Sequence, residues 1–283
     1  MGKIRTSWAL VKQSFGILRS DKELMLLPVL SAISCVLVTA VIVGAGTVAF
    51  LFQTGNATGP HTTEPQISQP LIYVGLFVFY VVNYFVIVFF NTALVGAASI
   101  RLDGGNPTLK DGLSLAWERK GVILQWAVLA ATVGVILKII EDRARWIGSL
   151  VAKLIGLAWA LASYFVVPIL AFEKLGPVDA LKRSAQLFRK TWGEQVVGGF
   201  SFGLIFFLLA IPGFLLPVAG GMIAGMGGLI AGAVVMILYF VLLAVVSSAV
   251  HGIFIAALYR YANTGQASAG FTADNFAMAW RRK

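Results

Sequence analysis

Four polar side chains stand inside long apolar stretches and are the first candidates for chemistry: Asn83, Asn91, Gln125 and His251. Such groups are costly in hydrocarbon and usually face other helices or a water-filled path. One interpretation is a polar pathway or ligand site between the stretches that carry Asn83 and His251. The alternative is hydrogen bonding between helices, which contributes about 0.6 kcal/mol per pair. No carboxylate or arginine lies in the middle of an apolar stretch. This absence argues against proton-coupled transport and voltage sensing as functions.

Residues for metal, cofactor or covalent chemistry are scarce in this chain. It has two histidines and a single cysteine, Cys35, so a Cys-based metal site and an internal disulfide are excluded. The sequence contains no G-x-S-x-G elbow, no P-loop and no dinucleotide-binding glycine motif. We therefore expect no cofactor, no metal and no enzymatic activity.

The composition indicates what must position the four polar groups. Of the 283 residues, 59% are apolar and 12% are charged, against about 45–50% and about 25% in an ordinary soluble domain. So few charges cannot cover a water-soluble particle of this size. Abundant aromatic and branched residues also exclude a disordered chain. A multipass membrane protein is the class that remains.

Six stretches are long and apolar enough to cross a bilayer, which takes about 20 residues of helix. Lipid cannot hydrogen-bond the backbone, so these stretches are predicted to be helical. The sequence therefore predicts an all-α polytopic bundle of six transmembrane helices in three hairpins. The predicted spans are residues 24–52, 71–100, 121–140, 146–172 (or from 154), 196–216 and 229–258.

Lys and Arg are distributed unevenly between the connections. The formal net charge is +10, and 22 residues are Lys or Arg. All of these except Lys138, Arg143, Arg145 and Lys153 fall on one side of the predicted spans. Membrane proteins hold such residues in the cytoplasm, so we predict a multipass protein of the cell (inner or plasma) membrane with cytoplasmic termini. The basic character is then a topology signal, and no nucleic-acid partner is expected.

Two amphipathic helices are predicted on the cytoplasmic side, at residues 4–18 and 177–192. The apolar stripe of the first consists of Ile4, Trp8, Val11, Phe15 and Leu18, and that of the second of Val178, Leu181, Ala185, Phe188 and Trp192. Basic segments at a membrane surface attract anionic lipid. The bilayer, with its anionic headgroups, is therefore the expected partner, and association with itself or with a membrane partner is left open. The candidate headgroup contacts are Arg5, Lys12, Lys182, Arg183 and Arg189.

Two pairs of segments indicate an internal duplication. The pattern K-x-S-x-x-apolar-apolar-R occurs at 12–19 and 182–189, and D-x-apolar-x-x-A-W-x-R-K occurs at 111–120 and 274–283. We predict a single integral membrane domain, 1–283. Its repeat-like halves, 4–120 and 177–283, flank a central hairpin at 121–172. Four spans separate equivalent positions, so the copies have parallel topology. Chance similarity between short basic amphipathic segments is the alternative.

Glycine and carboxylate positions add two narrower predictions. Two G-x-x-x-G segments follow one another, and their glycines allow helices to approach closely. This region either packs as an extension of the last span or re-enters the membrane as a non-helical gate. Glu173, a carboxylate near an inner helix end, is predicted to pair with a neighbouring Lys or Arg. The candidate packing glycines are Gly221, Gly225, Gly228 and Gly232.

Several motifs together resemble a prokaryotic family of multipass, six-span membrane proteins of unknown function. The resemblance covers nearly the whole chain and implies a single integral domain in a prokaryotic inner or cell membrane. It implies no activity. The plan of interfacial helix plus hairpin is also similar to that of Yip1-like membrane proteins. The motifs are Trp8–Ser14, Leu24–Ser31, Gly156–Trp159, Phe165–Pro168, Glu173, Leu181–Ser184, Thr191–Glu194 and Ala257–Tyr261.

These features predict one function ahead of an alternative. The first is a channel or transporter, indicated by the polar residues within spans and the glycine-rich break. The second is a membrane-organising or accessory protein that binds lipid or a partner through its basic amphipathic helices. A continuous polar cavity joining Asn83, Asn91 and His251 would favour the first.

Overall fold

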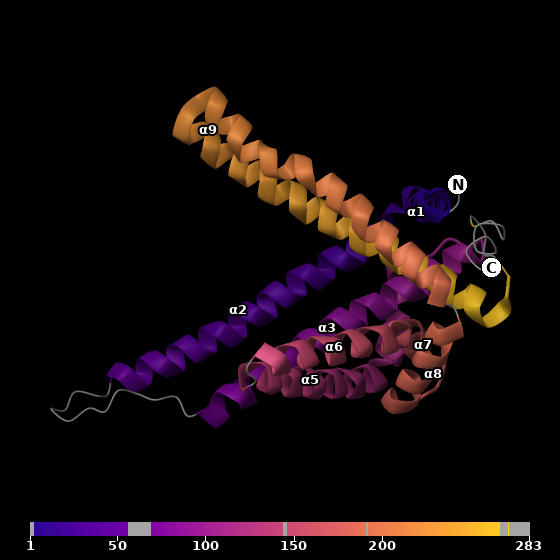
Figure 1. The fold of residues 1–283 in the computed structure, drawn as a ribbon, viewed down its shortest axis with the longest axis horizontal. Coiled ribbons are helices and arrows are strands. Elements are labelled where there is room, and N and C mark those ends of the chain that lie inside the picture. Colours follow the sequence, from indigo (N-terminus) through magenta and orange to yellow (C-terminus); the bar gives the residue numbers. More distant parts are fainter. Residues whose placement is uncertain (1–2, 56–68, 144–145, 191, 267–270, 272–283) are drawn as a thin grey trace.

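The computed structural model describes residues 3–55, 69–143, 146–190, 192–266 and 271. All regular structure in these ranges is helical, which confirms the predicted all-α fold (Figure 1). The helices are α1 (Lys3–Ser20), the short η1 (Lys22–Met25), α2 (Leu26–Gly55), α3 (Gln69–Leu102), α4 (Leu109–Glu118), α5 (Lys120–Arg143), α6 (Trp146–Ala162), α7 (Val166–Phe172), α8 (Pro177–Lys190) and α9 (Trp192–Thr264).

Five segments of the described chain are long and apolar enough to cross a membrane. They are Lys22–Val48, Tyr73–Leu102, Lys120–Asp142, Leu150–Phe172 and Gly203–Thr264. The first four agree with the first four predicted spans. The fifth, 62 residues long, takes in most of the two remaining ones. The chain therefore has the make-up of an integral membrane protein.

Helix α9, 73 residues long, is bent back on itself at Ala224 and Gly225. Gly225 has φ 58° and ψ −139°, a conformation that glycine adopts without the steric penalty of a side chain. The two arms, residues 192–223 and 226–264, lie side by side as a hairpin (Figure 1). The region that the sequence left open between packing and re-entry is thus helical on both sides of a two-residue bend.

Glycines hold the two arms of α9 close together. A Cβ added at Gly228 would collide with the backbone carbonyl of Gly220, and one at Gly232 would collide with the backbone of the first arm. Gly221 has only side-chain atoms of the other arm near it. Gly225 was predicted to be a helix-packing glycine. It instead forms the bend and has open space around it. The pairing of the hairpin arms decides which glycines are in contact, and G-x-x-x-G spacing along one helix does not reveal that pairing.

Helix α3 lies at the centre of the bundle, where it contacts α2, α4, α5, α7 and α9. The largest buried side chains around it include Leu94, Ile123, Phe165, Ile169 and Phe254, none of them more than 1% exposed. These residues come from α3, α5, α7 and its N-terminal flank, and the second arm of α9. They lie toward one end of the bundle, and that end holds most of the hydrophobic core.

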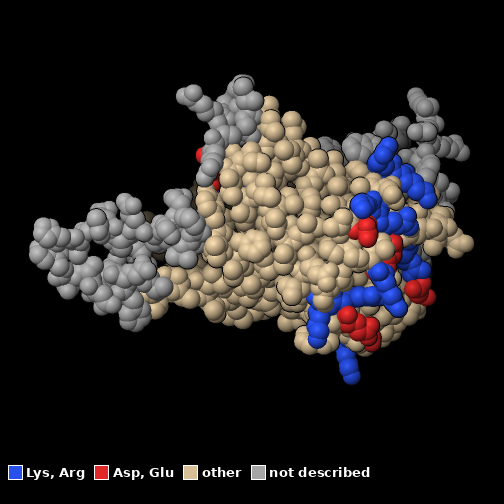
Figure 2. All heavy atoms as spheres, turned by 90° about the horizontal axis from the view of Figure 1, so that it is seen from below, with Lys and Arg blue, Asp and Glu red and all other residues tan. Residues whose placement is uncertain are grey.

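We call that end the basic end. It consists of α1, α4, α7, α8 and the last turns of α9, and Figure 1 shows these elements together. Lys and Arg gather there on the face seen in Figure 2, and the apolar body beside it lacks them. At the opposite end of α5, Lys138 pairs with Asp142 at 2.8 Å. The uneven distribution of charge along the sequence therefore corresponds to one end of the folded molecule.

The amphipathic helices α1 and α8 do not bury their whole predicted stripes. In α1, Val11 and Leu18 are buried, but Trp8 is 56% and Phe15 49% exposed. In α8, Phe188 is buried and Val178 is exposed, and the small residues Ala180 and Ser184 face the protein. Lipid and protein interior are equally apolar, so an apolar stripe cannot show which part of it will contact which.

The two copies of the predicted duplication have different neighbours. Helix α1 packs mainly on α9, whereas α8 packs mainly on α7, α6, α5 and α9. The helices that share the K-x-S pattern therefore do not occupy equivalent places relative to a hairpin. The second copy of the other pattern, 274–283, lies outside the described residues. The duplication stays a prediction from sequence.

Candidate functional site at the basic end

The four predicted intramembrane polar residues are dispersed over the bundle. Asn83 donates its amide to the Phe79 carbonyl of its own helix at 3.0 Å. Gln125 is exposed on α5. His251 on α9 lies edge-on to the Tyr164 ring, with centroids 6.3 Å apart. Asn83 thus has a partner that needs no second helix, and Gln125 faces away from the core.

The packing of α3 on α9 fixes the relative depth of these residues. A Cβ at Gly252 would collide with Leu94, so these two positions are level, and both helices run toward the basic end. On that register His251 lies within about one helical turn of Asn91, but about 15 Å along the axis from Asn83. The structure brings Asn91 and His251 to a similar depth and separates Asn83 from them.

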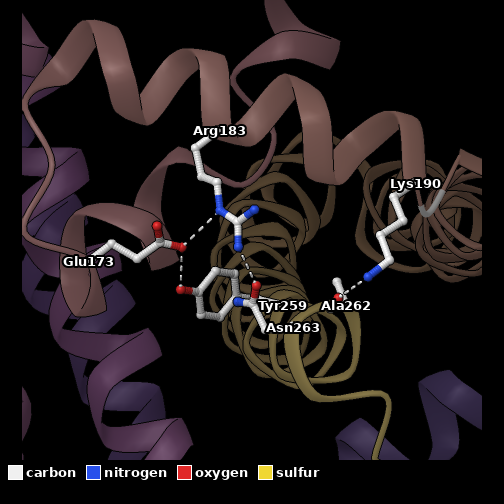
Figure 3. Close-up of polar contacts among 6 residues, drawn as sticks. All are labelled: Glu173, Arg183, Lys190, Tyr259, Ala262 and Asn263. Carbon is white, nitrogen blue, oxygen red and sulfur yellow. Dashed lines mark hydrogen bonds and ion pairs between the residues drawn. The ribbon is translucent and has the colours of Figure 1, made fainter.

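A polar cluster ties α7, α8 and α9 together at the basic end (Figure 3). One carboxylate oxygen of Glu173, just after α7, accepts from the Tyr259 hydroxyl at 2.9 Å and from Arg183 Nε at 3.4 Å. Arg183 also donates to Asn263 at 2.8 Å, and Lys190 Nζ donates to the Ala262 carbonyl at 3.1 Å. The pairing predicted for Glu173 is present, with Arg183 as its partner. We call Glu173, Arg183, Tyr259 and Asn263 the Glu173 cluster.

Two further contacts extend this connection to α3 and to the start of α7. Arg260 pairs with Asp103 and donates to the Ser99 carbonyl at 3.2 Å. The buried Ser184 hydroxyl accepts from the Phe165 backbone N–H at 2.9 Å, which satisfies a donor between α6 and α7. The last turns of α9 are thus joined to α3, α7 and α8 by polar side chains.

The predicted headgroup contacts differ in whether their charged groups are exposed or are used in contacts within the protein. Arg183 is part of the Glu173 cluster, so its guanidinium is used inside the protein. Lys182 pairs with Asp179 at 3.3 Å, but both side chains are about two-thirds exposed. Lys12 and Arg189 are exposed, and the side chain of Arg5 lies outside the described residues. Lys12, Lys182 and Arg189 are therefore the predicted contacts that an external anion can reach.

Exposed tryptophans also occur at the basic end. Trp8 of α1 is 56% exposed and Trp117 of α4 is 62% exposed. The Lys120 ammonium lies 3.9 Å from the centre of the Trp117 ring, a cation–π contact. Tryptophan is enriched at the membrane–water boundary. The contact between exposed Trp117 and Lys120 is therefore of a kind that suits a membrane–water boundary.

Helix α4 is fixed at its start by a capping box. The Thr108 hydroxyl accepts from the Asp111 backbone N–H at 3.3 Å, and the Asp111 carboxylate accepts from the Thr108 backbone N–H at 2.9 Å. The Thr108 hydroxyl also donates to the Asp111 carboxylate, at 2.7 Å. The two hydrogen bonds that the carboxylate accepts from Thr108, the backbone one foremost, favour its charged form and lower the pKa of Asp111. The cap determines where α4 begins and hence where Trp117 is presented.

A family model described as "Family of unknown function (DUF6159)" matches residues 71–271, which run from the start of α3 to Phe271. The chain belongs to the DUF6159 family. This confirms the resemblance to a family of unknown function that the sequence motifs indicated. No curated protein and no solved structure matches the chain.

The DUF6159 match contains the whole Glu173 cluster, with Lys182 and Arg189, whereas α1 and α2 precede it. The sequence placed Arg260 among the cytoplasmic cations but did not indicate that Tyr259 and Asn263 belong to the Glu173 cluster. A usable signal was present, because Tyr259 and Asn263 stand four residues apart near the end of an otherwise apolar helix and so share one face. Their partners come from segments about 80 residues away, and the sequence does not identify them.

Proposed function

We propose that this DUF6159 protein is a membrane-organising protein whose basic end binds anionic phospholipid headgroups. The observation that carries the proposal is the grouping of accessible Lys12, Lys182 and Arg189 with exposed Trp8 and Trp117 at one end of an apolar bundle. A lysine or arginine near an anionic surface contributes about 1 kcal/mol of attraction. Several such side chains at one end of the molecule therefore favour anionic lipid.

In this proposal the chain crosses the cell membrane six times, with the basic end and both termini in the cytoplasm. Each arm of α9 exceeds the about 20 residues that a crossing needs, so α9 supplies two crossings and α2, α3, α5 and α6–α7 supply four. Cytoplasmic enrichment of Lys and Arg supports this orientation. The similarity in plan to Yip1-like proteins stays a prediction.

Transport through the intramembrane polar residues has less support. A pathway needs polar groups that line one continuous passage. Asn83 is hydrogen-bonded within its own helix, Gln125 is exposed on α5, and Asn83 is distant in depth from His251. Asn91 and His251, at similar depth, are the residues on which a transport function would rest.

The proposal is tested by reconstituting the full chain in nanodiscs of phosphatidylcholine with a minor fraction of pyrene-labelled phosphatidylglycerol. Energy transfer from tryptophan to pyrene reports enrichment of the anionic lipid around the protein. We expect enrichment in the wild type and its loss in Lys182→Glu/Arg189→Glu, with most of it also lost at high salt because screening is strong beyond about 3 Å at about 1 M. The charge-conserving pair Lys182→Arg/Arg189→Lys is the matched control and should retain enrichment.

The same experiment separates the two functions. Equal enrichment in the charge-reversed and charge-conserving pairs would overturn the headgroup proposal. Ion or solute flux into vesicles, present in the wild type and abolished by Asn91→Leu or His251→Leu, would replace it with transport.

A further inference from the structure

A cavity of about 320 Å³ lies between α1 and the two arms of α9. Stripes of residues from three helices line it. Trp8, Val11 and Phe15 come from α1, Ile205 and Leu209 from the first arm, and Val246 from the second. Its volume falls within the about 300–1,000 Å³ of typical ligand pockets. The cavity is therefore large enough to hold a ligand, and we do not regard it as a packing defect.

The chemistry of the lining restricts what can occupy the cavity. The lining surface is almost entirely apolar, and among the described residues that form it Lys12 is the charged one. The other polar groups are the Trp8 indole N–H and the Tyr239 hydroxyl, and the Tyr239 hydroxyl donates to the Leu209 carbonyl. A bound water needs two to four polar partners, which this lining does not provide. The cavity therefore suits an apolar chain with a negative charge at the end near Lys12.

The shape of the cavity matches one leaflet of a bilayer. On the second arm of α9 its lining extends from Tyr239 to Val250, which is about 16 Å along a helix axis. That is about half of the about 30 Å hydrocarbon core. The exposed Trp8 and Lys12 lie on α1 at the basic end, where the headgroup layer would be.

We propose that this cavity is a specific site for one anionic phospholipid. An acyl chain lies between α1 and the arms of α9, and the phosphate is held by Lys12. The inference deepens the proposed function, because it names one lipid and one site within the basic end. It makes α1 a helix that closes over a lipid, and it differs from surface attraction in requiring a chain-sized space.

The test uses full-length protein equilibrated with mixed phosphatidylglycerol and phosphatidylcholine in a mild detergent, and native mass spectrometry counts the retained lipids. We expect one retained phosphatidylglycerol per chain. Lys12→Ala should lower its retention about fivefold, the factor that one lysine contributes at an anionic surface. Val246→Trp should fill the cavity and remove retained lipid of both kinds.

Two matched controls separate the cavity from the remaining surface. Leu238→Trp adds the same side chain at a position on the same arm that is 64% exposed and outside the lining, and Lys182→Ala removes a cation elsewhere on the basic end. Both should keep the retained lipid. Unchanged retention in Val246→Trp, or phosphatidylglycerol held equally by wild type and Lys12→Ala, would overturn the proposal.

A second readout keeps the test decisive if Val246→Trp does not fold. Phosphatidylglycerol with brominated chains should quench a fluorescence component that disappears in Trp8→Phe, and failure to quench it would also contradict the site. The proposed lipid site and the proposed function can be contradicted independently of each other. Lys182→Glu/Arg189→Glu should abolish surface enrichment without releasing the retained lipid, and Val246→Trp should release the retained lipid without abolishing surface enrichment.

Discussion

The second arm of α9 passes through two regions that are equally apolar and differently packed. From about residue 249 onward, toward the basic end, its side chains are buried on nearly every turn, as with Ile253 at 0% and Phe254 at 0% exposed. Nearer the bend, large apolar residues such as Ile237 and Leu238 are 58% and 64% exposed. Hydrophobicity in a membrane protein therefore does not mark the core, because lipid surrounds an apolar side chain as favourably as protein does.

Polar contacts follow the same division. The basic end has the Glu173 cluster, the Arg260–Asp103 pair and the buried Ser184 contact. Nearer the bend, the arms are held by glycine backbone contact, by ring packing such as Phe214 on Phe240, and by the Tyr239 hydroxyl, which donates to the Leu209 carbonyl. We infer that the basic end supplies most of the folding stability and that the far part of α9 is adapted to lipid.

The largest expected difference concerns two isoleucines on the same arm. Ile253→Ala should destabilise the protein by about 2–5 kcal/mol, because it leaves a cavity in the core. Ile237→Ala makes the identical change at a lipid-facing position and should stay within about 0.5 kcal/mol. Chemical unfolding in detergent micelles measures both. Equal losses would show that the two regions do not differ as described.

A second comparison tests close packing at the basic end with glycines. A Cβ at Gly112 of α4 would lie 2.5 Å from the Ala93 carbonyl oxygen, whereas Gly121 of α5 has nothing within 4 Å. Gly112→Ala should therefore cost about 1–3 kcal/mol through overpacking. Gly121→Ala should be neutral or slightly stabilising, since alanine favours helix. A neutral Gly112→Ala would mean that α4 is not held tightly against α3.

The Glu173 cluster should contribute more to the free energy of unfolding than an exposed ion pair does. Glu173→Ala removes the partner of both Arg183 and Tyr259 and should cost about 1–2 kcal/mol, at the lower end for charged hydrogen bonds because the carboxylate is partly exposed. Lys182→Ala removes an exposed pair and should cost less than about 0.5 kcal/mol. Thermal unfolding of the two variants side by side checks the order. A larger loss in Lys182→Ala would contradict it.

The smallest expected effect is a pH dependence at the start of α4. Hydrogen bonds from Thr108 lower the pKa of Asp111. A folded-state pKa below the unfolded value of about 3.9 gives stability that is present above that value. That stability is lost as the pH falls through the folded-state pKa. Asp111→Asn should therefore be less stable than wild type near neutral pH, with the difference shrinking on acidification. A difference independent of pH would contradict the cap.

Much of the fold could be predicted from the sequence, because the bilayer imposes strong constraints. Long apolar runs had to be helices, and the positions of α1, α8 and the first four spans follow from periodicity and length. The break near Gly225 was visible as glycine richness. The hairpin form of α9 was implied by two adjacent spans.

The side-chain arrangement could not be predicted, for physical reasons. The sequence predicted that Glu173 would pair with a cation. It could not predict the second partner, Tyr259, which lies 86 residues away in sequence. The sequence predicted an apolar environment for Trp8 and Phe15. Hydropathy does not show whether that environment is lipid or a cavity shared with α9. Asn83 and His251 were foreseeable as costly in lipid, but their depth depends on the register of α3 against α9.

In the proposed orientation the basic end lies in the cytoplasm and the far ends of the helices lie outside. Single cysteines at two exposed positions, Arg189→Cys in α8 and Glu141→Cys at the far end of α5, test it in a Cys35→Ser background. A membrane-impermeant maleimide should label Glu141→Cys in intact cells and Arg189→Cys only after the membrane is opened. Labelling of Arg189→Cys in intact cells would contradict the account.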